Sequence, residues 1–479
     1  MNESLTLSAT SIAAAIRAGE ITSRQAVDQH IRRIREINPV INAVVAERFA
    51  PARAEADAAD RYLADNGPDH CPPLHGVPCT IKESFSLSGM PNTSGLMSRK
   101  GVVPGYDAPT VSRLRGAGAI PMGVTNVSEL CMWMETSNRV YGRTSNVYDP
   151  SRIVGGSSGG EGAIISSGGS PFGLGSDIGG SIRMPAFFNG VFGHKPTGGL
   201  IPNTGQYPVA EKEVSRMCTT GPLARRAEDL PLLVGILAGP DGVDPECVNM
   251  EIGDAFSVSV EGLRVLDVPG TGRIRVSGEL LAAQSLAGRA LAGRGALVSR
   301  TGFPRLRDAL YIWMATLQAV EGTTPFGVML GNGEPLAVAA ALGSWMLGRS
   351  PHTIPAIALA GLERLPASLD RYVEEGNRLR EELVEAIGDG VMLFPSYSTV
   401  APRHNIPKLQ LYHWAHTAIF NTMGFPSTQV PLGLNRRNLP LGVQVVGAPG
   451  NDHVTMGVAM ELERIFGGWT PPWKVEGAR

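Results

Sequence analysis

The chain has 479 residues, of which 43% are hydrophobic and 18% charged, and its formal net charge is -2. This composition is that of a folded globular protein and excludes a disordered or fibrous chain. A net charge so close to zero produces no field that would attract a polyanion, so nucleic acid is excluded as the principal partner and a small-molecule substrate is favoured.

The first 70 residues are expected to be mainly helical. Cap residues precede apolar residues at helical spacing in TLSATSIAAAIRAG and in TSRQAVDQHIRRIREINP, and Pro39 is expected to end the second helix. INAVVAER is a strand candidate. PARAEADAADRYLADNG has the proline near its start and the glycine at its end that are typical of a helix.

Residues 75–200 continue with alternating strand and helix patterns. GVPCTIKES and IPMGVTN are strand candidates, and DAPTVSRLRGAGA between them is a helix candidate. Such alternation is typical of helices packed on a largely parallel sheet, so an α/β fold is predicted. We expect this segment to form the core of the protein.

The alternation weakens from about residue 230 to 390, where longer helical stretches such as LDRYVEEGNRLREELVEAIG predominate. We interpret this region as an insertion or cap that contributes to a substrate pocket. Residues 391–479 contain the strand candidates VMLFPSY, PSTQVPLG and LPLGVQVVG, followed by a closing helix. If these strands rejoin the first sheet, the chain forms one large domain.

The cysteines and the amino terminus indicate a cytoplasmic protein. The five cysteines form neither a C-x-x-C pair nor a zinc-ligand spacing, so we expect reduced thiols and no bound metal. The amino terminus lacks a basic region, and its apolar run IAAAI is too short for a signal-peptide core. We also expect no transmembrane segment, because no run reaches the roughly 18 to 20 apolar residues that one requires.

Two glycine-flanked serine clusters follow each other, with Ser157 and Ser181 separated by 24 residues. In GGSSGGE, Ser158 and Glu161 have the spacing of a capping box, which would leave Ser157 free. In DIGGSIR, Ser181 follows a strand pattern at the start of a helix, where successive N–H groups can bind the oxyanion of an acyl-transfer reaction. An isolated cluster of this kind is more often a simple turn. The predicted donors are the amides of Ile178, Gly179, Gly180 and Ser181.

A serine nucleophile requires a base, and no histidine lies in the immediate neighbourhood of these clusters, since the nearest one downstream is His194. A lysine can serve instead, because an apolar site favours its neutral form. Lys82 stands at the end of the apolar strand candidate GVPCTIKES. Taken alone, this lysine is more often explained by a strand that ends at the surface.

The segments GVPCTIKES, GGSSGGEGAIISSGG and GLGSDIGGSIRMPA, in this order, resemble the amidase signature family of serine hydrolases. Further segments, among them TNVSELCMWMETSN and LPLGVQVVGAPGNDH, are most similar to the fatty acid amide hydrolases of that family, especially the second vertebrate type. Only the region around residues 245–345 matches poorly. The resemblance implies a single α/β domain with a large mixed sheet, mostly parallel and covered by helices on both faces. It also implies hydrolysis of carboxamides through an acyl-enzyme, without metal or other cofactor.

The family pattern, carried over to matching positions, makes Ser181 the nucleophile and Lys82 the base. Ser157 becomes the relay serine, beside a cis peptide bond that does not involve proline. We expect Asp177 and Arg183 to form a supporting ion pair, with direct binding of substrate by Arg183 as the alternative. Many family members have Asp after the lysine, whereas this chain has Glu there, as fatty acid amide hydrolases tend to.

Methionine and tryptophan residues in several segments are candidates for a pocket that binds an apolar acyl or aryl group, although such clusters are more often ordinary core. These residues are Met132, Trp133, Met134, Trp313 and Trp345. The apolar stretch PLAVAAALGSWMLG is a candidate for a helix that covers the pocket or makes peripheral contact with a membrane.

Other functions remain as alternatives. The amidase subunit of a glutamyl-tRNA amidotransferase would share all three reactive residues but would need partner subunits, together with a glutamine pocket. A catalytically silent small-molecule binding protein is the alternative from another class. An α/β-hydrolase is disfavoured because GGSIR lacks the second glycine of G-x-S-x-G, and a nucleotide-binding module because no GK[ST] follows the glycines. The sequence alone does not determine the physiological amide, the length of its acyl group or activity on esters. It does not determine the oligomeric state either, and a homodimer is one option.

Overall fold

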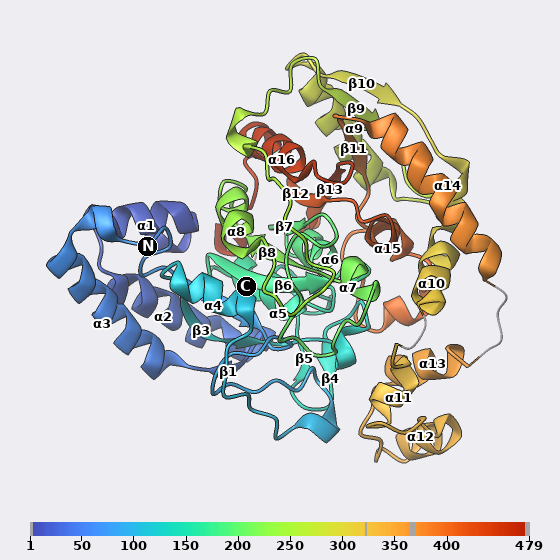
Figure 1. Ribbon diagram of the computed structural model, residues 1–479, viewed down its shortest axis with the longest axis horizontal. Helices are drawn as coiled ribbons and strands as arrows, with labels where there is room; N and C mark the ends of the chain where they lie inside the picture. The colour runs from blue at the N-terminus through green and yellow to red at the C-terminus, as the bar shows by residue number, and fades with distance from the viewer. Residues whose placement is uncertain (1–2, 321–322, 365–368, 475–479) are drawn as a thin grey trace.

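An eleven-stranded sheet runs through the computed structural model, which describes residues 3–320, 323–364 and 369–474. Within these residues the strand order is β1-β3-β2-β6-β8-β7-β12-β13-β11-β9-β10, with helices on both faces (Figure 1). The single large α/β domain with a mixed sheet is thereby confirmed. The strands are β1 (Val44–Glu47), β2 (Pro78–Lys82), β3 (Ile120–Thr125), β6 (Phe172–Asp177), β7 (Phe192–Lys195), β8 (Thr219–Ala224), β9 (Arg264–Asp267), β10 (Leu297–Arg300), β11 (Val391–Phe394), β12 (Ser427–Leu434) and β13 (Pro440–Val446), and a small hairpin contains β4 (Ser137–Asn138) and β5 (Gly142–Arg143).

The expectation that the sheet is mostly parallel is wrong. Parallel pairing is confined to β3-β2-β6 and β11-β9-β10, while the other six neighbouring pairs of the described sheet are antiparallel. The alternating strand and helix patterns predict the parallel group around β2 correctly. They do not extend to β12 and β13, which follow each other after a short turn and must therefore pair antiparallel.

Helices pack on the sheet through several hydrophobic cores. One core joins α4, α8, α9 and α16 to the sheet, a second contains α10, α14 and α15, and a third contains α2, α3 and α5. The helices are α1 (Ala9–Arg17), α2 (Ser23–Ile41), α3 (Phe49–Asn66), α4 (Pro109–Gly116), α5 (Gly159–Ser166), α6 (Arg183–Phe188), α7 (Val214–Met217), α8 (Asp229–Leu237), α9 (Gly278–Ala292), α10 (Ala309–Ala319), α11 (Phe326–Leu330), α12 (Val338–Met346), α13 (Ile354–Leu362), α14 (Asp370–Ile387), α15 (Ala415–Thr422) and α16 (Asp452–Phe466).

Pro39 lies inside α2 and does not end it, contrary to the expectation. The helix continues to Ile41 and ends at Asn42, which adopts a left-handed conformation with φ of 49°. Proline removes one hydrogen bond of the helix. The buried side chain of Ile41 is 0% exposed, so packing of the last turn offsets this loss.

The range 230–390 is not a single insertion. Strands β9 and β10, with α9 between them, extend the main sheet beside β11, and α10 and α14 pack on its core. Only α11, α12 and α13 form a small group at one side of the molecule, away from the sheet (Figure 1). The strands β11, β12 and β13 rejoin the first sheet, as the one-domain interpretation requires.

Candidate active site

The two strands that carry the predicted base and the predicted nucleophile loop are neighbours. β2 and β6 are parallel, so their carboxyl ends lie at the same edge of the sheet. Lys82 is the last residue of β2, and the loop with Ser181 follows directly after β6. Ser157 lies in the loop before α5, where a Cβ at Gly156 would overlap the backbone of Trp133. The sheet edge therefore collects polar side chains from three segments.

Lys82 is hydrogen-bonded to two serines. Its Nζ donates to Ser157 Oγ at 2.8 Å and to Ser176 Oγ at 2.9 Å. Lys82 is 0% exposed and Ser157 is 1% exposed, and the Gly156–Ser157 peptide is cis. Ser157, Ser176 and Ser181 line one cavity of about 410 Å³. The structure thus places Ser157 and Ser181 on one cavity wall and connects Lys82 to Ser157, and it adds Ser176, which no sequence motif indicated.

Ser158 does not form the expected capping box with Glu161. It occupies the N-cap position of α5, but its side chain makes no capping hydrogen bond, and its Oγ donates to the carbonyl of Ser176 at 3.3 Å. Glu161 instead accepts from Thr80 Oγ1 at 2.6 Å and from Thr125 Oγ1 at 2.8 Å. The prediction was wrong because hydroxyl groups on β2 and β3 compete with the local cap for this carboxylate.

Burial raises the pKa of Glu161 to about 8, although the hydroxyls of Thr80 and Thr125 and the amine of Lys82 oppose the shift. Burial therefore favours the protonated form of this carboxyl in the folded protein.

The raised pKa of Glu161 predicts that stability falls as pH rises. The stabilisation that the Glu161 carboxyl contributes is fully present below its ordinary pKa of 4.5. It is lost as the pH rises to about 8, because unfolding releases one proton in this range. The free energy of unfolding should fall by up to about 1.4 kcal/mol per pH unit from this group. Glu161→Gln should flatten the dependence in urea unfolding between pH 5 and 8, whereas Glu36→Gln, at an exposed position on α2, should not. Equal slopes for Glu161→Gln and the parent chain would contradict this prediction.

Asp177 and Arg183 form a buried ion pair beneath the Ser181 loop. Arg183 Nη2 lies 2.9 Å from Asp177 Oδ1, and both side chains are 0% exposed. Burial alone would raise the pKa of Asp177, but the charge and hydrogen bonds of Arg183 hold it well below its ordinary range. Arg183 also donates to Gln444 and Asn421, and it does not line the cavity. This geometry fits the supporting role and not direct binding of substrate.

The expected set of oxyanion donors needs one correction. The amide of Gly180 donates to Asp177 Oδ1 at 2.6 Å, so it is engaged and does not face a substrate. The carboxylate of Asp177, three residues earlier in the chain, accepts this N–H, so the N–H is not available to a substrate in the cavity. The amides of Ile178, Gly179 and Ser181 have no hydrogen-bond partner within the described ranges. Ile178 lines the cavity beside Ser181.

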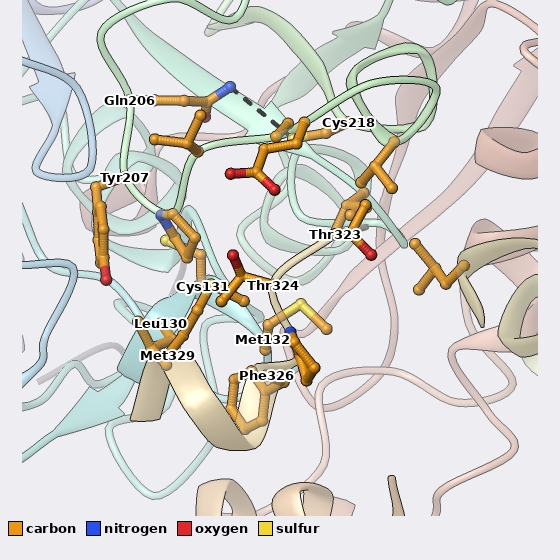
Figure 2. Close-up of a pocket in the computed structure, with 18 of the residues that line it drawn as sticks. Leu130, Cys131, Met132, Gln206, Tyr207, Cys218, Thr323, Thr324, Phe326 and Met329 are labelled. Atoms are coloured by element: carbon orange, nitrogen blue, oxygen red, sulfur yellow. Dashed lines mark hydrogen bonds between the residues drawn. The ribbon is translucent and has the colours of Figure 1, made fainter. Parts of the chain in front are cut away.

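The cavity wall is largely apolar. Figure 2 shows Leu130, Met132, Phe326 and Met329 gathered on one side of the cavity, with Gln206 and Cys218 on the other. The apolar lining residues are Leu130, Met132, Ile178, Val209, Val214, Leu317, Phe326, Val328 and Met329. Several come from α11 and the segment before it, which no motif marked as part of the site.

Among the predicted pocket residues, Met132 lines this cavity. Trp133 and Trp313 line a much smaller cavity of about 10 Å³, which shares Met132 and Ser181 with the first. Both residues therefore lie near Ser181, but not on the wall of the larger cavity.

Met134 and Trp345 were wrongly predicted to line the pocket. Met134 is 1% exposed and accepts a hydrogen bond from the hydroxyl of Tyr397, so it belongs to the core. Trp345 lies on α12, is 39% exposed and lines a separate surface cavity of about 350 Å³. The residue type alone does not distinguish these environments, because methionine and tryptophan suit a core, a pocket or a surface.

Histidine does not contribute to the wall of the main cavity in the part of the chain that the structure describes. Three histidines pair with carboxylates elsewhere, in the pairs His194–Asp452, His352–Glu129 and His404–Glu135. Within residues 3–320, 323–364 and 369–474, no cluster of His, Cys, Asp or Glu side chains is arranged to hold a metal ion.

The arrangement contains the parts that acyl transfer needs. Ser181 lies at a cavity beside three amides, those of Ile178, Gly179 and Ser181, that have no partner in the described chain. The buried Lys82 is hydrogen-bonded to Ser157 on the same cavity wall. On this α/β sheet, these parts are typical of a serine hydrolase.

Comparison with known proteins gives the same class. The family model described as Amidase matches residues 25–456, and the chain belongs to the amidase family. It is an amide hydrolase. Fatty-acid amide hydrolase 2 of Homo sapiens is 43% identical over 492 residues, which cover 98% of this chain and 91% of that protein.

The chain is also similar to two other proteins. A glutamyl-tRNA(Gln) amidotransferase chain of Synechococcus sp. (strain CC9902) is 30% identical, with 94% of each chain covered. The solved structure of 6-aminohexanoate cyclic dimer hydrolase complexed with substrate superposes with a TM-score of 0.79 at 26% identity, and the match covers 96% of this chain and 97% of that one.

Proposed function

We propose that this amide hydrolase cleaves carboxamides with apolar acyl or aryl groups, fatty amides among them, through an acyl-enzyme on Ser181. The observation that carries the proposal is the 2.8 Å hydrogen bond from Lys82 to Ser157 on the wall of the cavity that Ser181 lines. The apolar lining and the identity to a fatty-acid amide hydrolase support the preference for the acyl group.

The proposed reaction uses the three side chains as a proton relay. Neutral Lys82 takes a proton from Ser157, which takes one from Ser181 as Ser181 Oγ bonds to the carbonyl carbon. The electron pair of the C=O bond moves to the oxygen, which the amides of Ile178, Gly179 and Ser181 stabilise. The C–N bond then breaks, and the relay returns the proton to the departing nitrogen. Water then adds to the carbonyl carbon of the acyl-enzyme and loses a proton to the relay. The bond between this carbon and Ser181 Oγ breaks, the relay returns the proton to Ser181 Oγ, and the acid is released.

A hydrolysis panel tests the substrate class. Primary amides of increasing chain length, an aryl amide, acetamide and L-glutamine are compared by kcat/KM. Each methylene buried in an apolar wall contributes about 0.8 kcal/mol, so kcat/KM should rise about fourfold per methylene until the cavity is filled. A preference for L-glutamine together with a co-purifying partner would favour the amidotransferase function, and a flat panel would refute the apolar pocket.

We also propose that α12 makes peripheral contact with a membrane. No helix in the part of the chain that the structure describes is long and apolar enough to cross a bilayer. None of the residues of α12 is buried, and the helix lies in one small group with α11, whose residues line the cavity. An apolar surface therefore lies close to the cavity. Its exposed side chains are Leu342, Trp345, Met346 and Leu347.

Liposome flotation tests this contact. The purified chain should float with vesicles, and the double variant Met346→Glu with Leu347→Glu should not, because two charges cannot enter the apolar layer without a large desolvation cost. Phe256→Glu, at a residue that is 66% exposed outside this group, is the matched control. Absence of flotation together with a homodimer that the double variant dissociates would instead assign the surface to a second copy of the chain.

The cysteines support a cytoplasmic location, which we propose as well. All five are unpaired, and two of them, Cys79 and Cys247, are buried. Thiols of this kind persist in a reducing compartment.

A further inference from the structure

We infer that Trp313 and Thr417 are positioning residues of the oxyanion site. Trp313 holds the carbonyl of Ile178 and so orients the amide of Gly179, and Thr417 holds the carbonyl of Gly179, which lies between the free amides of residues 179 and 181. Trp313 Nε1 donates to the carbonyl of Ile178 at 2.8 Å, and Thr417 Oγ1 donates to the carbonyl of Gly179 at 2.8 Å. The inference rests on the proposed role of Ser181 and adds the residues that shape its surroundings.

Every carbonyl from residue 177 to residue 181 has a donor. Besides the two bonds above, Asn421 Nδ2 donates to the carbonyl of Asp177 at 2.7 Å. The carbonyl of Gly180 accepts from Met184 N at 2.8 Å, and that of Ser181 accepts from Ser158 N at 3.2 Å. The loop is therefore held in one conformation by hydrogen bonds, most of them from other segments.

These carbonyl bonds determine where the amides point. In a planar trans peptide the N–H of one residue points opposite to the C=O of the residue before it. The bond from Trp313 to Ile178 thus directs the N–H of Gly179 away from α10. The bond from Thr417 to Gly179 likewise directs the N–H of Gly180 toward Asp177, where it is bound. Among the described residues, the amides of Gly179 and Ser181 are therefore free, and the amide of Gly180 between them is hydrogen-bonded.

The loop of residues 177–181 packs closely against α10 and α15. Trp313 on α10 is 4% exposed and Thr417 on α15 is 0% exposed. Gly180 has φ of 121°, and a Cβ added there would overlap Thr417 Oγ1. The ring of Trp313 also lies 5.0 Å from that of Trp414, between ring centroids. The loop geometry that the reaction needs is thus imposed by helices that are remote from the family motifs in sequence.

The test compares Trp313→Phe with Trp469→Phe. Both variants keep an aromatic ring and remove one indole N–H. The Nε1 of Trp469 is buried without a hydrogen-bond partner among the described residues, and Trp469 lines neither of the two cavities, whereas the Nε1 of Trp313 holds the carbonyl of Ile178. Removal of one oxyanion donor typically costs 10²- to 10³-fold in kcat, so a donor that is misdirected but still present should cost about tenfold. We expect kcat of Trp313→Phe to fall about tenfold with KM within about twofold, and Trp469→Phe to match the parent chain.

A trifluoromethyl ketone separates positioning from general damage. Ser181 Oγ adds to its carbonyl carbon and leaves an anionic oxygen in the oxyanion site. Its inhibition constant should rise by the same factor as kcat falls in Trp313→Phe. Equal effects on KM, on the inhibition constant and on kcat, or no difference between Trp313→Phe and Trp469→Phe, would overturn the inference.

Variants of Thr417 provide an independent test of the inference. Its hydroxyl also lies 3.0 Å from the carbonyl of Trp414, so the bond to Gly179 is the shorter of two. Thr417→Val should lower kcat about tenfold, and Thr417→Ser should restore it because the hydroxyl is retained. Thr422→Val, on the same helix, removes a buried hydroxyl that has no partner among the described residues and serves as the control.

Failure of the proposed function has a different signature. A parent chain that neither hydrolyses amides nor reacts with a fluorophosphonate at Ser181 would refute that function and this inference with it. A parent chain that does both, with Trp313→Phe and Thr417→Val fully active, would refute the positioning role alone.

Discussion

Ser181→Ala is expected to abolish amide hydrolysis, with kcat/KM lower by at least about 10⁴-fold. Loss of the nucleophile leaves only substrate binding and the oxyanion donors, which by themselves give a small part of a serine hydrolase's rate. Stability should change by about 0.5 kcal/mol or less, because the change removes a single hydroxyl from a cavity wall where Ser181 is 7% exposed.

Covalent labelling makes this prediction specific. A fluorophosphonate should modify Ser181 in the parent chain, and mass spectrometry should find no modification in Ser181→Ala. Ser166→Ala is the matched control, since Ser166 is a buried serine of α5 that does not line the cavity. Turnover of amides by Ser181→Ala, or labelling at another serine, would contradict the assignment of the nucleophile.

Lys82→Met is expected to lower kcat/KM by about 10⁴-fold as well, because it removes the amine that accepts the relay proton. Lys82 Nζ donates to Ser157 Oγ, and no histidine lines the cavity wall in the described chain. Methionine keeps the unbranched apolar stem that fills this buried position. The variant should therefore fold, since an apolar side chain replaces an amine in the interior.

Lys195 offers a matched control for Lys82. It is also fully buried, its Nζ donates to the carbonyl of Pro196, and it does not line the cavity. Burial and the charge of Arg183 lower the pKa of Lys195 to about 7. Lys195→Met should retain kcat/KM within about tenfold, while Lys82→Met loses it. The assignment of the base would fail if the two variants showed the same loss, or if Lys82→Met reacted with fluorophosphonate as fast as the parent chain.

The motif residues could be predicted from the sequence because their signals are local. Glycines that bring the backbone close to other segments, a lysine at the end of an apolar strand and a serine after a strand are all visible within a few residues. The parallel pairing of β2 with its neighbours followed from the alternation of strand and helix patterns. Together with the family resemblance, these signals were sufficient to predict that Lys82, Ser157 and Ser181 lie in one site.

The partners of individual side chains could not be predicted in the same way. The S-x-x-E spacing indicated a cap for α5, but Glu161 bonds to threonines on β2 and β3, which only the sheet brings near. Met134 and Trp345 resemble pocket residues in type, yet one lies in the core and the other at the surface of α12. Gly180 has the residue type of an oxyanion donor, and Asp177 takes its amide.

The sequence by itself determined the class of fold, the family and the three candidate reactive side chains, because turn chemistry, periodicity and motif order are properties of short segments. The tertiary structure alone decided how the sheet pairs beyond β6, which amides of the Ser181 loop are engaged and which residues line the cavity. These features depend on strand register and on hydrogen bonds between segments far apart in the chain, such as that from Trp313 to Ile178 across 135 residues. No local pattern records a bond of that kind, since its energy depends on two positions that only folding brings together.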